Sequence, residues 1–548
     1  MTQTATDFTT GNVPDAPRSD LPELLLALSR DLRAISYTVD GVAEALGPSA
    51  HAALGRDQLI PALLVSGRLA GSDDTSVRAL AAVVQLWLLA VPQSVDAIDA
   101  ALPHVRTQGL ADLGLVAVES GMVSAKVDLR PYGWDPNLDG SGGAELWVAS
   151  DLAAHQAPGV LRHDHVLGIG QASTTLVQVT VRKHSRRALD LGTGCGIQTF
   201  HLLHHCEHVT ATDISERALA FTRFNLLLNA PQLNLDPANL EDRVSLRLGS
   251  LLEPVAGQRF DLVVSNPPFV ITPRTSGETP SGQFTYRDGG LPGDEIVASL
   301  VRTMSGVLEP GGTAQMLGNW EVVSGSEWHD RPAAWLEGQD VDSWFIQREQ
   351  VGPEQYAETW LQDASENRDR AHYRESYAAY LDDFASRDVG GIGFGMIWMR
   401  RRDAAQAAIK RFEEITYPIE QPIGPHLGAA VDRADWLVGA SLPDTRLVVA
   451  GDVTEERHQR PGALHPGVIL LRQGAGLRRT NLLSTELAGF VSACDGELTV
   501  RQLAGALEAI LGNAEDIDPA TFRAGLLAGV ENLVLDGFLI PAQEKETP

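Results

Sequence analysis

The stretch Arg187–Leu203, RALDLGTGCGIQTFHLL, decides the fold of this chain. It begins as a short apolar run typical of a buried strand, passes through a loop with Gly192, Gly194 and Gly196, and continues as a helix. Glycines at such a junction allow a tight turn, bring the backbone close to a ligand and leave the helix N-terminus accessible to it. The stretch therefore predicts a strand-loop-helix unit that binds a ligand at the carboxyl end of a parallel strand.

Further apolar runs extend this unit into a sheet. The runs HVTATD, RVSLRL and FDLVVSN end at Asp213, Leu248 and Asn266, and TAQMLGN, SWFIQRE and GIGFGMIWMR follow later in the chain. Strands that alternate with helical patterns are typical of a parallel sheet with helices on both faces. We expect residues 146–415 to form one seven-stranded α/β domain.

The segments on either side of this domain predict additional domains, because 548 residues are too many for one ordinary core. Residues 1–20 are polar, without a basic start or an apolar stretch, which predicts a disordered lead-in. Helical patterns followed by a strand-like ribbon predict a winged-helix-like accessory domain over residues 21–145. After the Pro-rich connector YPIEQPIGP, residues 420–548 predict a second winged-helix-like α+β domain.

Charge and composition limit the kinds of molecule that we expect the protein to bind. With 43 basic and 71 acidic residues, the net charge of −28 disfavours a bare polyphosphate, although the basic clusters RKHSRR and MRRRD keep RNA as an alternative partner. The longest apolar run, Ala79–Val91, is too short to span a bilayer, so we expect a cytoplasmic protein with no membrane partner. Three cysteines allow neither a disulfide framework nor a four-cysteine zinc site, and we expect no metal. Nothing in the sequence indicates an oligomeric state.

Two acidic residues indicate which ligand the glycine loop binds. Asp213 ends the next strand, where a carboxylate can accept hydrogen bonds from both hydroxyls of a ribose. A nicotinamide or flavin dinucleotide would use a similar loop. Asp190, however, opens the loop and would repel a pyrophosphate, whereas it suits the ammonium group of an amino acid. The pair favours S-adenosylmethionine as the cofactor.

With these motifs, the chain resembles the class I S-adenosylmethionine-dependent methyltransferases over roughly residues 160–400. The motifs DLGTGCG, TDIS, GSLLEPV and SNPPF occur in the order found in that family. The resemblance implies a Rossmann-like sheet, with Asp190 holding the methionine ammonium through water. By the same resemblance, the other cofactor-binding residues are Gly192, Thr193, Gly194 and Gly196 at the methionine end, Asp213 at the ribose, and Ile214 and Ser250 at the adenine.

The stretch Ser265–Phe269, SNPPF, carries the chemistry. A planar amide or aryl amine has a delocalised lone pair and is a poor nucleophile. The side-chain carbonyl of Asn266 and the backbone carbonyl of Pro267 can accept both of its N–H bonds and hold the nitrogen in line with a methyl group. Pro268 further restricts the backbone, and Phe269 offers a face for a flat substrate group. We predict that Asn266, Pro267, Pro268 and Phe269 form the catalytic corner of an N-methyltransferase.

The methyl acceptor is a planar nitrogen of one of several kinds. Among methyltransferases, this corner is typical of enzymes that act on protein glutamine amides, adenine N6 or guanine N2 of ribosomal RNA. The segment YRDGGLPGDE is similar to HemK-type protein-glutamine methyltransferases, and the acidic charge also slightly favours a protein substrate. The residues that carry this similarity are Tyr286, Arg287, Asp288, Gly289, Gly290 and Gly293. A nucleobase amine, a catalytically silent binding scaffold and a dinucleotide oxidoreductase are the alternatives.

Overall fold

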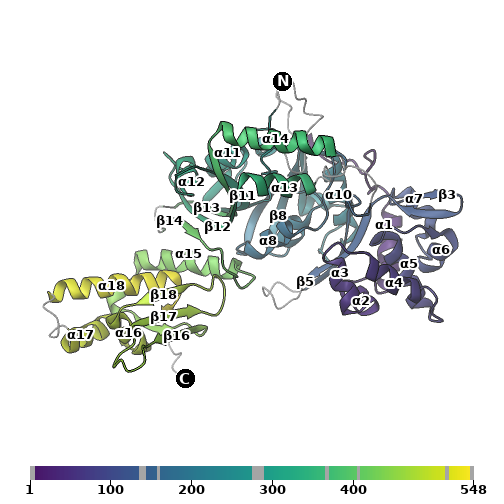
Figure 1. Ribbon diagram of the computed structural model, residues 1–548. Coiled ribbons are helices and arrows are strands. Elements are labelled where there is room, and N and C mark those ends of the chain that lie inside the picture. The colour runs from purple at the N-terminus through teal and green to yellow at the C-terminus, as the bar shows by residue number, and fades with distance from the viewer. Residues whose placement is uncertain are drawn as a thin grey trace. The chain divides into compact units, whose positions relative to one another are not determined.

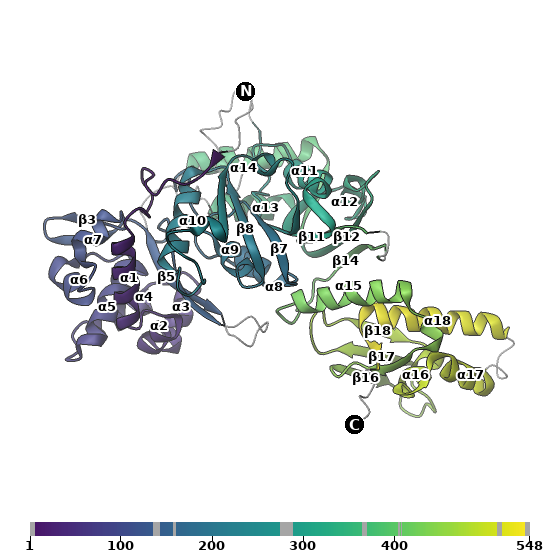
Figure 2. The ribbon, with the colours of Figure 1, turned by 180° about the vertical axis from the view of Figure 1, so that it is seen from behind.

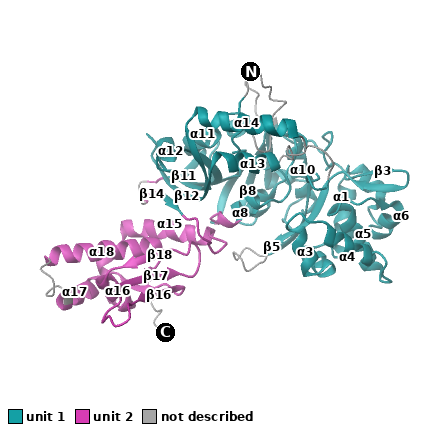
Figure 3. Ribbon diagram, viewed as in Figure 1, with its two compact units in different colours: residues 1–177, 183–401, 412–414 teal, residues 178–182, 402–411, 415–548 magenta. Residues whose placement is uncertain are grey.

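The computed structural model describes residues 6–134, 143–156, 161–274, 289–363, 370–403, 406, 408–511 and 518–542. The chain divides into two compact units, which Figure 3 shows in different colours. Unit 1 comprises residues 1–177, 183–401 and 412–414, and unit 2 comprises residues 178–182, 402–411 and 415–548.

A nine-stranded sheet forms the centre of unit 1 (Figure 1), in the order β1-β9-β8-β7-β10-β11-β13-β12-β14. Strands β9, β8, β7, β10 and β11 run parallel, and β13 is antiparallel to both of its neighbours. All seven predicted strands are present, and the expectation of a Rossmann-like α/β sheet is confirmed. They are β7 (Ser185–Leu191), β8 (Cys206–Asp213), β9 (Val244–Leu248), β10 (Phe260–Ser265), β11 (Leu308–Val323), β12 (Val341–Val351) and β13 (Val389–Arg401). The edge strands β1 (Thr6–Asp7) and β14 (Lys410–Glu414) are additional.

Helices cover both faces of this sheet (Figures 1 and 2). Helices α9 (Ile197–Leu202) and α10 (Glu216–Leu228) pack on β8, and Ser215 caps α10 by accepting a hydrogen bond from the backbone N–H of Ala218. The two faces of β11 are covered by different helices. Met316 and Trp320 share a core cluster with α11 (Glu295–Thr303), while Asn319, on the other face, bonds to α13 (Pro353–Asp363). Helix α14 (Arg370–Ser386) packs beside α13.

The N-terminal segment is part of the folded unit. Strand β1 pairs antiparallel with β9 at the sheet edge, and the side chains of Phe8, Val13 and Ala16 are buried. The prediction of a disordered lead-in is therefore wrong for residues 6–20, while residues 1–5 lie outside the described residues. Composition misled here because these few apolar side chains pack on a surface that other parts of the chain provide, and hydrophobic pattern within the segment cannot show it.

Helices followed by a small sheet make up the next part of unit 1, in the order predicted. The three strands, in the order β2-β4-β3, form an antiparallel sheet. The elements are α1 (Pro22–Ala34), α2 (Val39–Leu46), α3 (Pro48–Leu54), α4 (Ile60–Leu69), α5 (Thr75–Trp87), β2 (Gln93–Ser94), α6 (Val95–Ala101), α7 (Arg106–Asp112), β3 (Val116–Glu119) and β4 (Met122–Ala125). This region belongs to the same compact unit as the central sheet.

The β5–β6 pair joins this helical region to the central sheet. Strands β5 (Asp128–Trp134) and β6 (Ala144–Ser150) pair antiparallel across the predicted domain boundary. On the helical side, the Trp147 indole N–H donates to the carbonyl of Tyr37 at 2.6 Å. On the other side, Asn229 and Asn225 of the α10 region bond to the backbone of β6, as in the 2.9 Å bond from the Trp147 N–H to Asn229 Oδ1. The backbone bonds of β6 are thus completed by side chains of the core.

Unit 2 contains helices and strands, as predicted, but arranges them around two three-stranded sheets, ordered β19-β15-β20 and β16-β17-β18. Its core includes Phe490, Val530, Leu533 and Phe538, all fully buried. Its elements are α15 (Gly424–Gly439), β15 (Arg446–Val449), β16 (Val453–His458), β17 (Val468–Gln473), β18 (Thr480–Leu483), α16 (Thr485–Ser492), β19 (Asp495–Thr499), α17 (Val500–Leu511), α18 (Pro519–Asp536) and β20 (Leu539–Pro541). Within the described ranges, no helix has both the length and the apolar character that crossing a bilayer requires.

The asparagine contacts to β6 lead to a stability prediction. Asn229 is fully buried, accepts from the Trp147 N–H and donates to the Trp147 carbonyl at 2.7 Å. Replacing Asn229→Ala leaves these backbone groups unpaired, and we expect the free energy of unfolding to fall by about 2 kcal/mol. Chemical denaturation measures the change. The control is Asn239→Ala, because Asn239 is exposed and we expect a change within about 0.5 kcal/mol. Equal effects in the two variants would contradict the prediction.

Candidate active site

The register of the parallel strands brings the predicted site segments to one edge of the sheet. Leu191 of β7 lies beside Thr212 of β8 and Ser265 of β10, and Asp213 lies beside Leu248 of β9. Because parallel strands end at the same edge, the loops that follow these residues are neighbours. Those loops are the glycine loop, the turn with Asp213 and Ile214, the Gly249–Ser250 turn and the SNPPF corner.

The glycine loop has the backbone geometry that its sequence requires. The φ angles of Gly192, Gly194 and Gly196 are +77°, +57° and +95°, values that side chains rarely adopt. A Cβ placed on Gly192 would lie 3.9 Å from the backbone oxygen of Asn266, so the loop directly adjoins the SNPPF corner. A Cβ placed on Gly194 would meet no atom within 4 Å. The loop therefore leaves free space at Gly194 for a ligand to approach its backbone.

Asp190 ties this loop to the helix that follows it. Its side chain is fully buried, and its Oδ2 accepts from the Thr193 hydroxyl at 2.8 Å and from the hydroxyl and backbone N–H of Thr199 at 2.7 and 3.0 Å. Burial raises the pKa of this carboxyl to about 6, against the lowering effect of these hydrogen bonds. Its Oδ1 is buried and has no hydrogen-bond partner. One oxygen thus shapes the loop, and the other can accept from an ammonium group or a water molecule.

Asp213, at the end of β8, uses its two carboxylate oxygens to hold the backbone of two neighbouring loops. Its Oδ2 accepts from the backbone N–H of Gly194 at 3.0 Å, and its Oδ1 accepts from that of Ser215 at 2.9 Å. Burial raises the pKa of this carboxyl as well. The next side chain, Ile214, is 59% exposed, which is unusual for an isoleucine beside a core strand and suits packing against a flat ligand.

The turn after β9 borders the same place. The backbone N–H of Gly249 donates to the Asp213 carbonyl at 2.9 Å, which holds the turn against the end of β8. Gly249 has a φ of +155°, and a Cβ there would lie 2.6 Å from the ring of Pro254. Ser250 follows, and its carbonyl accepts from the N–H of Glu253 at 3.0 Å. The bond from Gly249 therefore holds the turn that contains Ser250 against the end of β8.

The SNPPF corner is fixed from both sides and presents one unused acceptor. The Ser265 hydroxyl donates to the Leu191 carbonyl at 2.8 Å, which anchors the corner to β7. The Pro267 carbonyl accepts from the backbone N–H of Phe269 at 2.8 Å, and the half-buried Phe269 ring packs against two core clusters. Within the part of the chain that the structure describes, the Oδ1 atom of Asn266 is buried without a hydrogen-bond partner. It is an acceptor that a ligand N–H could satisfy.

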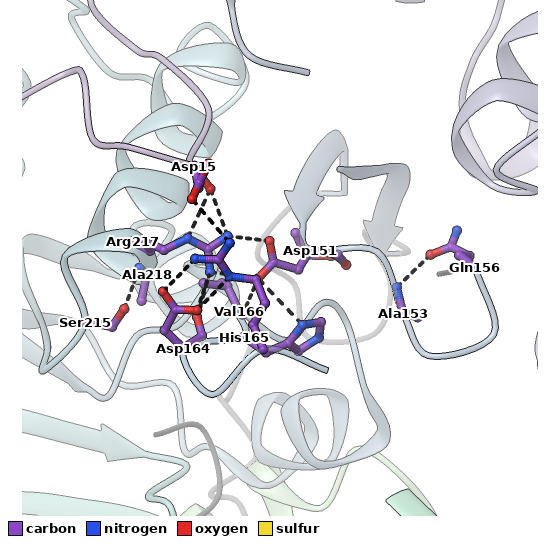
Figure 4. A network of polar contacts seen from close by, with 12 residues as sticks. Asp15, Asp151, Ala153, Gln156, Asp164, His165, Val166, Ser215, Arg217 and Ala218 are labelled. Atoms are coloured by element: carbon purple, nitrogen blue, oxygen red, sulfur yellow. Dashed lines mark hydrogen bonds and ion pairs between the residues drawn. The ribbon is translucent and has the colours of Figure 1, made fainter. Parts of the chain in front are cut away.

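Sequence reasoning missed Arg217, whose contacts are drawn in Figure 4. This buried side chain donates to the Asp15 carbonyl at 2.8 and 3.0 Å, to the two carboxylate oxygens of Asp151 at 2.6 and 3.0 Å, and to the Asp164 carbonyl at 2.7 Å. It joins the N-terminal segment, the end of β6 and the loop before α8 (Gln171–Val179) to the helix that follows Asp213. The sequence does contain one indication of this role. Arg217 is a cation in the first turn of a helix, a position that the helix macrodipole disfavours unless acidic or carbonyl partners surround it.

Tyr356 was also missed, although it supports the segment that follows the SNPPF corner. This residue of α13 is fully buried, and its hydroxyl accepts from the backbone N–H of Ile271 at 2.8 Å and from Asn319 Nδ2 at 2.9 Å. Ile271 lies two residues after the SNPPF corner. Helix α13 therefore holds the chain that leaves the corner, and the only signal was a tyrosine in an insert of the sheet.

The segment similar to HemK-type enzymes is described only in part. Tyr286, Arg287 and Asp288 lie outside the described residues. Gly290 and Gly293 have φ angles of +74° and +58°, and the next residue, Asp294, is buried and paired with Arg331 at 2.6 Å. A Cβ on Gly289 would lie 2.4 Å from the Cδ1 atom of Ile296. The glycines of this segment are thus required by a tight turn into α11.

Cys195 and the described metal-ligating side chains offer neither a reactive thiol nor a metal-binding cluster. Burial raises the pKa of the Cys195 thiol to about 12, so the thiolate that nucleophilic chemistry needs is disfavoured. Across the residues that the structure describes, no group of three or more His, Cys, Asp or Glu side chains could hold a metal ion.

Two family models match parts of the chain. Residues 34–126 match a domain of unknown function, DUF7059, and residues 151–280 match the methyltransferase small domain. The first range lies within the predicted N-terminal accessory domain. The second runs from the end of β6 past the SNPPF corner and so includes every predicted site residue.

Curated relatives and solved structures are similar to part of the chain. The ribosomal protein uL3 glutamine methyltransferase of Bradyrhizobium diazoefficiens is 28% identical over 190 residues, which are 34% of this chain and 56% of that protein. A release factor glutamine methyltransferase of Geobacter sulfurreducens is 30% identical over 194 residues, 33% of this chain and 62% of that protein. The chain thus spans little more than half the length of either relative. The match to a methyltransferase structure from Pyrococcus furiosus covers 46% of this chain and 93% of that chain, with 14% identity and a TM-score of 0.25.

The buried Asp190 carboxyl leads to a pH prediction. Its folded-state pKa of about 6 lies above the ordinary value of 3.8, so its contribution to stability is fully present below about pH 4 and is lost as the pH rises through 6. Relative to Asp190→Asn, which does not titrate, we expect the ligand-free wild type to lose about 2 kcal/mol of unfolding free energy between pH 4 and 7. Urea denaturation across this range measures the difference. A constant difference between the two proteins would contradict it.

The Arg217 contacts lead to a prediction about rigidity. Replacing Arg217→Met removes the guanidinium partner of the largely buried Asp151 carboxylate, which keeps the backbone N–H of Val166 as a donor, and we expect a loss of about 3 kcal/mol in unfolding free energy. Arg217→Lys keeps the charge but not the planar fork, so its effect should be intermediate. Hydrogen exchange should accelerate at the residues around Asp15 and at residues 161–166 in both variants. Unchanged exchange at these segments in the Met variant would show that Arg217 does not hold them.

Proposed function

We propose that this chain, whose residues 151–280 belong to the methyltransferase small domain family, is an S-adenosylmethionine-dependent N-methyltransferase that acts on the side-chain amide of a protein glutamine. The observation that carries the proposal is Asn266, whose Oδ1 is a buried acceptor without a partner beside the glycine loop. The names of two relatives, both glutamine methyltransferases, support the substrate class.

The residues around the glycine loop fit S-adenosylmethionine. The unpartnered Oδ1 of Asp190 suits the methionine ammonium, directly or through water, and the free space at Gly194 admits a ligand to the loop backbone. Asp213 would accept from the ribose hydroxyls, since each carboxylate oxygen can accept more than one hydrogen bond. Ile214 would pack on the adenine, and Ser250 would reach its edge. When bound, this cofactor supplies an electrophilic methyl group on a sulfonium.

The corner residues would prepare the amide nitrogen for this methyl group. Accepting an N–H at Asn266 Oδ1 orients the nitrogen and increases its electron density, which opposes the delocalisation that makes an amide a poor nucleophile. The prolines hold the backbone rigid, so the acceptor is already in place when the substrate binds. The Pro267 carbonyl, assigned from the sequence to the second N–H, already accepts from Phe269 and has one lone pair left.

The net charge of the chain slightly favours one of the two kinds of planar nitrogen. An exocyclic amine of a nucleobase would fit the same corner, but an RNA substrate would have to approach a chain with a net charge of −28. A protein surface faces no such general repulsion. We therefore favour the glutamine amide and keep the nucleobase amine as an outcome of the test.

Asn266→Ala tests the proposed function. We expect the dissociation constant for S-adenosylmethionine, measured by calorimetry, to stay within about threefold, because Asn266 is not among the residues assigned to the cofactor. We expect transfer of labelled methyl groups to fall at least about 100-fold, the usual scale for losing one preorganised group at a reacting centre. The acceptors are the release factors and ribosomal protein uL3 of the same organism, prepared unmethylated, together with its ribosomal RNA.

The control is Asn239→Ala, which should retain full transfer because the exposed Asn239 side chain donates to Asp236, three residues earlier, and contacts none of the predicted site residues. Label on RNA alone would favour the nucleobase amine. Binding of S-adenosylmethionine without transfer to any fraction would favour a silent scaffold, and binding of NADH instead would favour an oxidoreductase.

A further inference from the structure

We infer that unit 1 contains a second small-molecule site, which binds a free amino acid with a side-chain carboxamide, glutamine or asparagine. The site is a cavity of about 370 Å³ lined by Arg33, Gly143, Ala144, Glu145, Trp147 and Gln232. It lies beyond the far end of α10 from Asp213, and at about 1.5 Å of rise per residue the 13 residues of this helix separate the two places by about 20 Å. The cavity is therefore distinct from the candidate active site.

The backbone edge of β6 that faces α10 is bonded by two asparagine side chains. Asn229 Oδ1 accepts from the Trp147 N–H at 2.9 Å, and Asn229 Nδ2 donates to the Trp147 carbonyl at 2.7 Å. Two residues further along the strand, Asn225 makes the same pair of bonds to Ala149, at 2.8 and 2.9 Å. Each amide nitrogen also donates to one further carbonyl, that of Asn225 at 2.7 Å or that of Cys195 at 2.9 Å. A primary carboxamide thus satisfies both backbone groups of one strand residue and one carbonyl elsewhere.

The next position along this edge, Glu145, has the same geometry but no asparagine. In an antiparallel pair, the residues of a strand alternate between bonding to the partner strand and pointing their N–H and C=O groups outward. Trp147 and Ala149 point outward, so Glu145, two residues before Trp147, points outward as well. Across the described ranges, neither backbone group of Glu145 has a hydrogen-bond partner. Glu145 therefore presents to the cavity the same donor and acceptor that Trp147 presents to Asn229.

Gln232 supplies the further carbonyl that a carboxamide at this position needs. It follows Asn229 by three residues, lines the same cavity, and has a buried Oε1 without a partner among the described residues. Buried polar atoms are normally hydrogen-bonded, so this oxygen calls for a donor. A primary carboxamide fits all three groups, because its oxygen accepts from the Glu145 N–H while its two N–H bonds donate to the Glu145 carbonyl and to Gln232 Oε1. A trans peptide group does not fit, since its N–H and C=O point in opposite directions.

Two charged side chains at the cavity favour a free amino acid over a side chain of a protein. Arg33, in the last turn of α1, has its guanidinium carbon 5.8 Å from the centre of the Trp147 ring. Glu145 shares a face of β6 with Trp147, since alternate side chains of a strand point the same way. Neither Arg33 nor Glu145 forms an ion pair with another described residue. These charges match the carboxylate and the ammonium group of an amino acid, and the volume is that of a small-molecule site.

Titration with L-glutamine tests this site, with L-glutamate as a probe of the same shape without the carboxamide. By calorimetry on the full chain, we expect glutamine to bind at least about fivefold more tightly, because a carboxylate cannot donate to Glu145 or Gln232. Gln232→Leu should weaken glutamine binding at least about threefold, and Arg33→Met at least about fivefold. The matched control is Arg30→Met. Arg30 is exposed on the same helix and does not line the cavity, so binding should stay within about twofold.

Hydrogen exchange, followed residue by residue by NMR, locates the bound glutamine. In the free protein, the Glu145 N–H should exchange faster than the Trp147 N–H, which is bonded to Asn229. Saturating glutamine should slow exchange at Glu145 and leave residues 265–271 unchanged, which separates this site from the SNPPF corner. Neither measurement depends on methyl transfer, so both keep their meaning if the proposed function fails.

Several results would overturn the site. They are a wild type that does not prefer glutamine to glutamate, a Gln232→Leu variant that binds glutamine as tightly as the wild type, and protection at residues 265–271 in place of Glu145. Slow exchange at Glu145 in the free protein would also overturn it, because Gln232 would then occupy this position itself. Equal binding of acetyl-Gly-Gln-Gly-amide would overturn the assignment to a free amino acid. Circular dichroism reports whether each variant is folded, and if Arg33→Met is not, Gln232→Leu decides.

Discussion

The buried carboxylate of Asp190 is the interaction on which the rest of the site depends. A charge inside a protein is unfavourable unless donors surround it, and here Thr193 and Thr199 provide three hydrogen bonds to one of its oxygens. These bonds close the glycine loop onto the helix that follows, and the loop in turn adjoins the backbone of Asn266. Among the described residues, the other oxygen has no hydrogen-bond partner. The same group thus shapes the loop with one oxygen and leaves the other unpaired beside it.

The parallel sheet brings three other loops beside the glycine loop. Strands β7, β8, β9 and β10 run in the same direction and end at one edge, so the four loops that follow them are neighbours. Around this edge, the accessory parts of unit 1 add rigidity. Arg217 gathers three distant segments at the start of α10, and two buried asparagines at the end of that helix complete the backbone bonds of β6. In both places, buried polar groups from distant segments satisfy each other's hydrogen bonds. These bonds connect the helical N-terminal region to the central sheet within unit 1.

Helix α13 lies outside the motifs that define the fold. Sheets of this kind serve many substrates, and the site alone distinguishes them. In this chain, the insert between β12 and β13 contributes α13, whose Tyr356 hydroxyl accepts hydrogen bonds from the segment after the SNPPF corner and from Asn319.

The sequence by itself determined the strands, the glycine loop with Asp190 and Asp213, and the SNPPF corner. These features are local: a positive φ requires glycine, a strand shows in a few adjacent residues, and parallel strands must end at one edge. Only the tertiary structure decided that residues 6–20 pack on the sheet, that Arg217 bonds to Asp15, Asp151 and Asp164, and that Tyr356 bonds to Ile271 and Asn319. Each of these contacts joins residues far apart in the chain, and a hydrophobic or charge pattern within one segment carries no information about which distant surface will meet it.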